Sequence, residues 1–327
     1  MNTVEARLQD WILADAESQD LIDTNARIVT FAAALYAEYE PTRGPHPDFW
    51  QRLEAWLDNV ADETDQKALF RLVPHLLFIG PREFDSLYRV AYRDTFVRWL
   101  IDLLALDVRA PDLDAQIVAA VAGTWFCPIT DSMRINAFYK LNRLVGRDLR
   151  PDWRSLAQFG SEDKLRCFMK DESISRLVLL EDFVGTGSQI YDAIQFAGHL
   201  TPSVPILVVP LVMCPGAMGT IQTLETQYPH VTISPALTLR EDDFISDPPT
   251  PNELPLFADI RRIAVATFAS LKTGLSTKEL SQLYEPLGFG STGGLVVLYS
   301  NCPDNTLPLV HRTSDDWHPL FPRASRL

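Results

Sequence analysis

Two adjacent acidic residues, Glu181 and Asp182, follow a short apolar run and directly precede a glycine-containing loop. The four apolar residues 177–180 do not alternate with polar ones, which is typical of a strand buried on both faces of a parallel sheet. The loop, residues 183–189 (FVGTGSQ), leads into a helical pattern. Such a loop directs backbone N–H groups at one point, where the helix dipole adds positive potential. The segment therefore predicts an anion site, most simply for a phosphate.

The acid pair distinguishes this loop from other phosphate-binding loops. A P-loop requires a lysine that the segment lacks, and a dinucleotide loop requires a third glycine besides Gly185 and Gly187. Two carboxylates beside a phosphate repel it unless they bind another part of the ligand. Ribose hydroxyls donate to carboxylates, and Mg²⁺ with its waters also binds them. Acids and loop together predict a ribose 5-phosphate site; the alternative is an ordinary strand–turn–helix whose acids are surface caps.

The segment resembles the ribose-phosphate signature of type I phosphoribosyltransferases, in which a hydrophobic strand leads to two acids, two apolar residues, a variable position, Thr-Gly and a small polar residue. The resemblance implies that Glu181 and Asp182 are the active-site acids and hold the ribose hydroxyls of phosphoribosyl pyrophosphate. It also implies a Mg²⁺ ion, which Asp182 would contact through water. The 5-phosphate would be wrapped by Gly185, Thr186, Gly187, Ser188 and Gln189.

Two positions depart from that signature. Gly185 stands where some purine-salvage members carry an acid implicated in base chemistry, which puts the fate of the base in doubt. Gln189 stands where Thr or Ser is usual, a change that is tolerable because backbone amides do most of the phosphate binding.

A second loop, residues 130–134, follows a predicted strand (124–129) and precedes a helical run. It lies about 50 residues before the acid pair, where type I phosphoribosyltransferases place their pyrophosphate loop. Ligands of open parallel sheets bind beyond the carboxyl ends of the strands. Hydroxyls, N–H groups and a guanidinium would then contact pyrophosphate; the candidates are Thr130, Asp131, Ser132 and Arg134. The alternative is that Asp131 or Ser132 simply caps the helix.

The carboxy-terminal part carries further candidates. Four glycines fall within residues 288–294, where they either permit positive φ or let the backbone approach a ligand closely. After a predicted strand (295–299) come Asn301, Asp304 and Asn305, which would read a base edge or close over the ribose, or else form an Asx-type turn.

This segment, together with residues 317–323 (WHPLFPR), is similar to the carboxy-terminal region of a phosphoribosyltransferase-like family predicted in bacterial conflict systems, PRTase-CE. In that family a helical region precedes an EDFVGTG-type loop. The resemblance covers residues 120–327 well. It implies a role in defence against phage or in a related conflict operon, with a protein partner from such an operon.

The elements that must position these residues change in character along the chain. Residues 1–110 show helical spacing with Pro-Gly-rich breaks and no catalytic cluster, so we expect a helical region that acts as a hood or partner surface. From residue 111 onward, strands alternate with helices. The predicted fold is therefore α/β: a type I phosphoribosyltransferase-like parallel sheet flanked by helices over residues 111–327, with an N-terminal helical region.

Composition and charge narrow the possible binding partners and the cellular compartment of the protein. The net charge of −14 argues against broad nucleic-acid binding. No apolar run reaches the roughly 20 residues of a membrane span, and the polar N-terminus does not resemble a secretory signal. Four scattered cysteines without a C-x-x-C motif suit reduced thiols, so we expect a cytoplasmic protein.

Three functions remain open at this point. The first is an enzyme that uses phosphoribosyl pyrophosphate or a nucleotide with Mg²⁺. The second is a catalytically inactive sensor that binds the same ligand and signals through the helical region. The third is a protein-interaction module that retains the fold without the ligand.

Overall fold

A computed structural model describes residues 3–14, 18–42, 47–144, 160–277, 280 and 285–324. The chain forms two compact units. Unit 1 combines Met1–Pro81 with Glu241–Leu327, and unit 2 comprises Arg82–Arg240.

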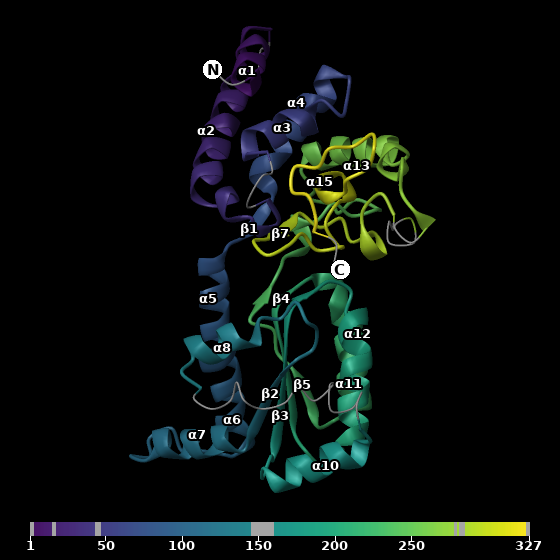
Figure 1. Ribbon diagram of the computed structural model, residues 1–327. Helices are drawn as coiled ribbons and strands as arrows, with labels where there is room; N and C mark the ends of the chain where they lie inside the picture. The colour runs from purple at the N-terminus through teal and green to yellow at the C-terminus, as the bar shows by residue number, and fades with distance from the viewer. Residues whose placement is uncertain are drawn as a thin grey trace. The chain divides into compact units, whose positions relative to one another are not determined.

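Unit 2 is built on a parallel sheet (Figure 1). Its strands are β2 (Thr124–Pro128), β3 (Arg176–Val184), β4 (Ile206–Met213), β5 (Val231–Ile233) and β6 (Leu237–Thr238). The order is β2-β3-β4-β5, with β6 also paired to β4, and every pairing is parallel. The predicted parallel sheet is thus confirmed. All residues of β4, and all of β3 except Arg176, are buried, which explains why their apolar runs do not alternate.

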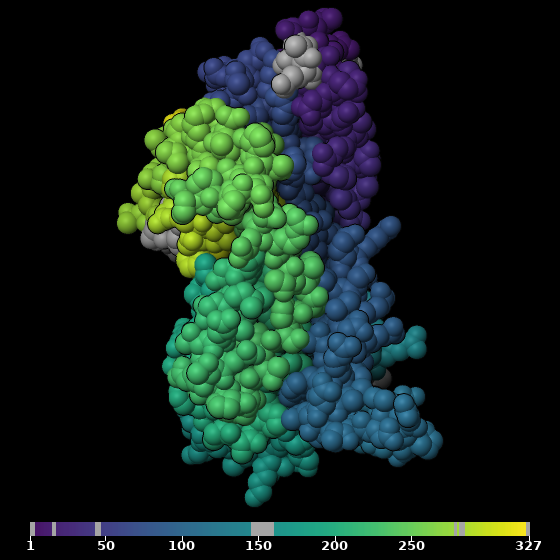
Figure 2. All heavy atoms as spheres, turned by 180° about the vertical axis from the view of Figure 1, so that it is seen from behind, coloured from purple at the N-terminus to yellow at the C-terminus, as the bar shows by residue number. Residues whose placement is uncertain are grey.

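Helices cover both faces of this sheet (Figure 1). On one face lie α10 (Glu162–Asp171), α11 (Ser188–Leu200) and α12 (Met218–Gln227). On the other lie α5 (Pro81–Val90), the π-helical segment Ala91–Phe96, α6 (Val97–Leu103) and α8 (Ile135–Leu141). The helix α7 (Leu113–Ala122) leads into β2. Figure 2, seen from behind, shows the blue residues of α5 and α6 lying against the teal and green residues that carry the sheet.

Successive residues of β2 show how the two faces are filled. The ring of Trp125 lies 5.1 Å from that of Phe168 on α10. The next residue, Phe126, points the opposite way, with its ring 4.9 Å from Phe96 and 5.5 Å from Phe138. Because a strand alternates its side chains, Trp125 packs against the helices of one face and Phe126 against those of the other.

Unit 1 joins the two ends of the chain. Its helices are α1 (Thr3–Ala14), α2 (Ser18–Ala34), α3 (Phe49–Leu57), α4 (Glu63–Leu72), α13 (Pro255–Thr267) and α15 (Pro308–His311). Strand β1 (Leu77–Ile79) pairs in parallel with β7 (Val296–Leu298). The indole N–H groups of Trp56 and Trp317 both donate to the Leu309 carbonyl, at 2.7 and 2.9 Å. The carboxy-terminal W-H-P-L-F-P-R segment therefore packs with the amino-terminal helices.

These units differ from the boundary near residue 110 that the sequence favours. Residues 82–110 belong to unit 2, and residues 241–327 belong to unit 1. The strand expected at 295–299 forms as β7, but it pairs with β1 and does not join the large sheet. Residues 1–110 show only helical spacing in the sequence, so β1, the pairing partner of β7, has no signal there. In the part of the chain that the structure describes, we find no helix whose length and hydrophobicity would let it cross a membrane.

Candidate functional site

The acid pair lies near the carboxyl end of β3. Glu181 is 1% exposed and Asp182 is 7% exposed, so neither is a surface cap. A buried carboxylate is costly unless hydrogen-bond donors surround it. The partners of these two residues therefore decide what the site is built to do.

Donors for both acids come from the loop after β2. The backbone N–H and the hydroxyl of Thr130 donate to the two carboxylate oxygens of Glu181, at 3.0 and 2.7 Å. The hydroxyl of Ser132 donates to Asp182 Oδ1 at 3.0 Å. The parallel register of β2 and β3, continued by Ile129 N–H donating to the Leu180 carbonyl at 2.8 Å, places this loop beside the acids. Two motifs that lie 50 residues apart in the chain form one cluster.

Two other residues of that loop, Asp131 and Arg134, have exposed side chains. Helix α8 begins at Ile135 with Arg134 at its cap position and no side-chain cap hydrogen bond. Neither Asp131 nor Ser132 is therefore the N-cap residue of this helix. The hydroxyl of Ser132 donates to Asp182 instead. Pyrophosphate binding by the loop stays a prediction.

The predicted phosphate loop links β3 to α11. Gly187 is the N-cap of α11 in the left-handed conformation, with φ +86°, a region that favours glycine. Because glycine has no side chain to act as a cap, the N–H groups of the first helical turn meet no cap from that residue. Ser188 and Gln189 are exposed in this turn, while Gly185 is buried. The loop thus has the geometry of an anion-binding helix start.

A residue on the next helix holds this loop in place. The hydroxyl of Thr220, on α12, donates to the Thr186 carbonyl at 3.0 Å. A Cβ atom added to Gly187 would lie 2.9 Å from both Cβ and Cγ2 of Thr220. No pattern in the sequence points to Thr220, because it stands in no motif and meets the loop only when α11 and α12 pack side by side.

Cys214 also lies beside the loop, but its thiol is not suited to act as a nucleophile. The N–H of Cys214 donates to the Val184 carbonyl at 2.8 Å. Burial raises the pKa of the Cys214 thiol to about 12. The thiolate is the nucleophilic form, so Cys214 is an inert neutral thiol near neutral pH.

The acids suit a metal ion that arrives with a substrate. Within the described residues, no group of three or more His, Cys, Asp or Glu residues is arranged to hold a metal. Mg²⁺ commonly uses only one or two carboxylates and completes its shell with water and substrate phosphates. Glu181 and Asp182 match that number of carboxylates, and Mg²⁺ binding by them stays a prediction.

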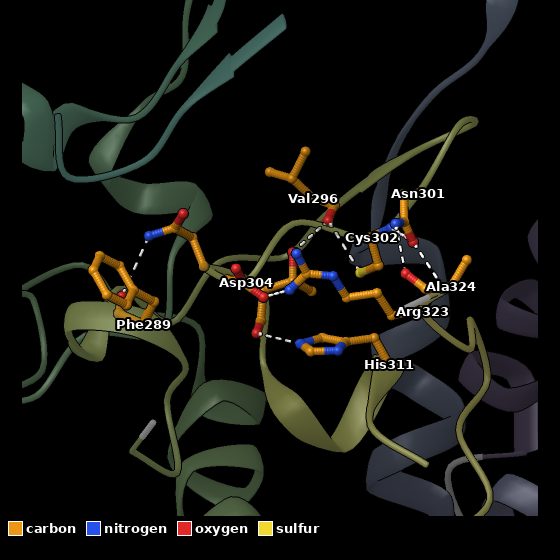
Figure 3. Close-up of polar contacts among 10 residues, drawn as sticks. Phe289, Val296, Asn301, Cys302, Asp304, His311, Arg323 and Ala324 are labelled. Carbon is orange, nitrogen blue, oxygen red and sulfur yellow. Dashed lines mark hydrogen bonds and ion pairs between the residues drawn. The ribbon is translucent and has the colours of Figure 1, made fainter. Parts of the chain in front are cut away.

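The carboxy-terminal candidates lie in unit 1, where their side chains serve the packing of that unit (Figure 3). Asn305 donates to the Phe289 carbonyl at 3.3 Å and to the Thr292 hydroxyl at 3.0 Å. Asn301 donates to the Ala324 carbonyl at 3.1 Å. Asp304 forms an ion pair with Arg323, and Figure 3 shows the two side chains pointing toward one another. A contact between these residues and a base stays a prediction.

The glycines of residues 288–294 allow the chain to approach itself. Gly288 has φ +87°, and a Cβ there would lie 2.8 Å from the Thr306 carbonyl oxygen. Gly293 has φ +62°, and a Cβ there would overlap the Ile245 carbonyl. The first reason that the sequence left open, a positive φ, is thus present at both glycines. The close neighbour is the protein's own backbone, and approach to a ligand stays a prediction.

Comparison with known proteins gives one match. A family model described as PRTase-CE matches residues 53–323. Neither the comparison with curated proteins nor that with solved structures gave a match. The matched range includes the acid pair, the phosphate loop and most of both units.

Proposed function

We propose that this chain, which belongs to the PRTase-CE family of phosphoribosyltransferase-like proteins, binds phosphoribosyl pyrophosphate or a nucleotide together with Mg²⁺ through unit 2. The proposal rests on one observation: two buried acids near the end of β3 are followed by the start of α11, whose N-cap residue is a glycine. The two carboxylates accept hydrogen bonds from hydroxyl groups, and the start of the helix binds an anion. A ribose 5-phosphate presents both groups.

Each part of the site has a role in this proposal. Glu181 and Asp182 orient the ribose through its hydroxyls. The first turn of α11 binds the 5-phosphate, in a position set by Thr220. Asp182 would hold the Mg²⁺ through water, and the metal would supply charge neutralisation for a pyrophosphate group. Departure of pyrophosphate from C1 through a cation-like transition state needs positioning and electrostatics more than a nucleophile, which agrees with the inert thiol of Cys214.

A sensor is the second candidate, and Gly185 favours it. Some purine-salvage relatives carry an acid at this position, whereas Gly185 offers no side chain for base chemistry. Such a sensor would bind the ligand without turnover and act on a partner protein through the helices of unit 1. Either function suits a role in a bacterial defence or conflict system, which is the setting that the family resemblance implies.

Calorimetric titration with phosphoribosyl pyrophosphate, with and without Mg²⁺, tests the proposal. We expect Mg²⁺-dependent binding. Asp182→Asn should weaken it by about 1–3 kcal/mol, because charge-assisted hydrogen bonds are lost. The matched control is Asp192→Asn, the same chemical change at an exposed position on α11, which should leave affinity unchanged.

The result separates the candidates. Release of pyrophosphate in the presence of Mg²⁺, with water or an added purine or pyrimidine base as the acceptor at C1, identifies an enzyme. Binding without release in the presence of these acceptors identifies a sensor. If the wild-type protein binds neither phosphoribosyl pyrophosphate nor a nucleoside 5-monophosphate, the ribose-phosphate proposal is wrong and the interaction module becomes the remaining function.

A further inference from the structure

We propose that the hydroxyls of Thr130 and Ser132 act as an internal substitute for the ribose diol: they occupy the acid pair in the free protein, and a ribose phosphate must displace them to bind. We call this arrangement the hydroxyl clasp. The inference rests on the proposed function of unit 2, and it makes the 130–132 loop a regulator of that site.

The geometry of the clasp matches that of a vicinal diol. The two hydroxyl oxygens lie 2.7 Å apart. One donates to Glu181 at 2.7 Å and the other to Asp182 at 3.0 Å. Neighbouring hydroxyls on a ribose ring are likewise separated by about one hydrogen-bond length, and each carries one proton to donate. The acid pair is therefore already bound to two hydroxyls in the arrangement expected of the ligand.

The number of hydroxyl protons indicates that a ribose diol can replace the hydroxyls of Thr130 and Ser132 at the acid pair. Each hydroxyl has a single proton, so when both donate to carboxylates the two oxygens face one another with no proton between them. A ribose diol faces the same restriction, but its covalent ring fixes the separation. The ligand thus replaces two hydroxyl–carboxylate bonds with two equivalent ones.

Burial makes displacement necessary. At 1% and 7% exposure, Glu181 and Asp182 are closed to an incoming hydroxyl. Thr130 and Ser132 are themselves half-buried, so they lie nearer the surface than the acids that they contact. Replacing the hydroxyls of Thr130 and Ser132 by those of the ribose leaves the number of hydrogen bonds to the acids unchanged, so it adds little to the affinity for the ligand. The phosphate bound at the first turn of α11 must therefore provide the free energy that opens the clasp.

The test measures the sign of an affinity change. The probe is ribose 5-phosphate, which contains the diol and the phosphate but no pyrophosphate. Ser132→Ala and Thr130→Val remove one hydroxyl each, and the valine keeps the shape and the backbone N–H of Thr130. Each variant should bind ribose 5-phosphate about 2- to 10-fold more tightly than the wild type, the equivalent of one net hydrogen bond that no longer has to be displaced.

Thr223→Val is the matched control, because it removes a hydroxyl that donates to the Gly219 carbonyl on an exposed part of α12. Its affinity should equal that of the wild type. Thermal denaturation checks folding. Without ligand, each clasp variant should have a lower melting temperature than the wild type. Saturating ribose 5-phosphate should raise the melting temperature of each variant by more than it raises that of the wild type.

The outcomes distinguish the clasp from the proposed function. Tighter binding by the variants supports the clasp, and so does binding by a variant when the wild type binds too weakly to detect. Unchanged or weaker binding by the variants, with measurable wild-type affinity, refutes the clasp and leaves the proposed function standing. Absence of ribose 5-phosphate binding by every protein, wild type and variants, refutes the clasp, and the proposed function is then decided by the titration with phosphoribosyl pyrophosphate.

Discussion

Replacing Gly187 with alanine should destabilise unit 2 by about 2–5 kcal/mol. Two effects contribute to this loss. Gly187 has φ +86°, and the left-handed conformation costs a non-glycine residue about 1–2 kcal/mol. The new Cβ would also lie 2.9 Å from Cβ and Cγ2 of Thr220, and overpacking of this kind costs about 1–3 kcal/mol.

Gly219→Ala is the matched control, since Gly219 precedes Thr220 on the same helix. A Cβ there meets no atom within 4 Å, and Gly219 is not among the residues with positive φ. Alanine is the better helix former and restricts the unfolded chain, so this variant should gain about 0.4–1 kcal/mol. The two substitutions add the same methyl group on either side of one contact, yet their effects should have opposite signs.

Urea denaturation measures both free energies of unfolding. Hydrogen–deuterium exchange of peptides from β3 and α11 assigns the change to unit 2. Ribose 5-phosphate affinity should fall in Gly187→Ala, because the loop that carries the phosphate-binding N–H groups shifts away from Thr220. Equal stability of the two alanine variants would refute the reasoning, because it would mean that the loop adopts neither the left-handed conformation nor the close packing against α12.

Two further predictions concern unit 1. Burial lowers the pKa of His311 to about 4, so its stabilising contribution is complete above the unfolded-state pKa near 6.5 and is lost as pH falls toward 4, by up to about 3 kcal/mol. Urea unfolding between pH 4 and pH 7.5 should show this loss, and His311→Gln should flatten it; an unchanged slope in the variant would contradict the assignment to His311. Gly293→Ala should prevent unit 1 from folding normally, because the added Cβ would overlap the Ile245 carbonyl. The control is Gly216→Ala in unit 2, where the added Cβ would have its nearest neighbour at 3.9 Å, and this variant should be tolerated. Limited proteolysis of the two variants compares them, and similar resistance would show that the backbone near Ile245 can move aside.

Local patterns were sufficient to predict the centre of unit 2. The unbroken apolar run of β3 indicated a strand buried on both faces, and the glycine loop indicated a helix start, because each pattern reflects interactions among neighbouring residues. The resemblance of Glu181 to Gln189 to a ribose-phosphate signature indicated the type I phosphoribosyltransferases. The carboxy-terminal segment with residues 317–323 then indicated the family that the comparison shows. These conclusions needed no knowledge of distant contacts.

Contacts between distant segments were decided by the tertiary structure alone. The parallel register of β2 and β3 brings Thr130 to Glu181, and the packing of α11 beside α12 brings Thr220 to Gly187. The sequence placed the 130–134 loop at the same edge of the sheet as the acids but did not show the contact with Glu181. It gave no signal for Thr220, because the hydroxyl of a threonine looks the same in a motif, a cap or a packing site.

The division into units has the same origin. Strand β1 is three residues long, too short for its composition to distinguish it from the surrounding helices, and it forms because β7, more than 200 residues later, supplies its hydrogen bonds. The glycines at 288–294 show the limit most clearly: their number predicted unusual backbone geometry, but only the position of Ile245 and Thr306 showed that the space they leave is filled by the protein itself. Sequence determines which conformations a segment favours, and the burial of distant surfaces against one another determines which neighbour it meets.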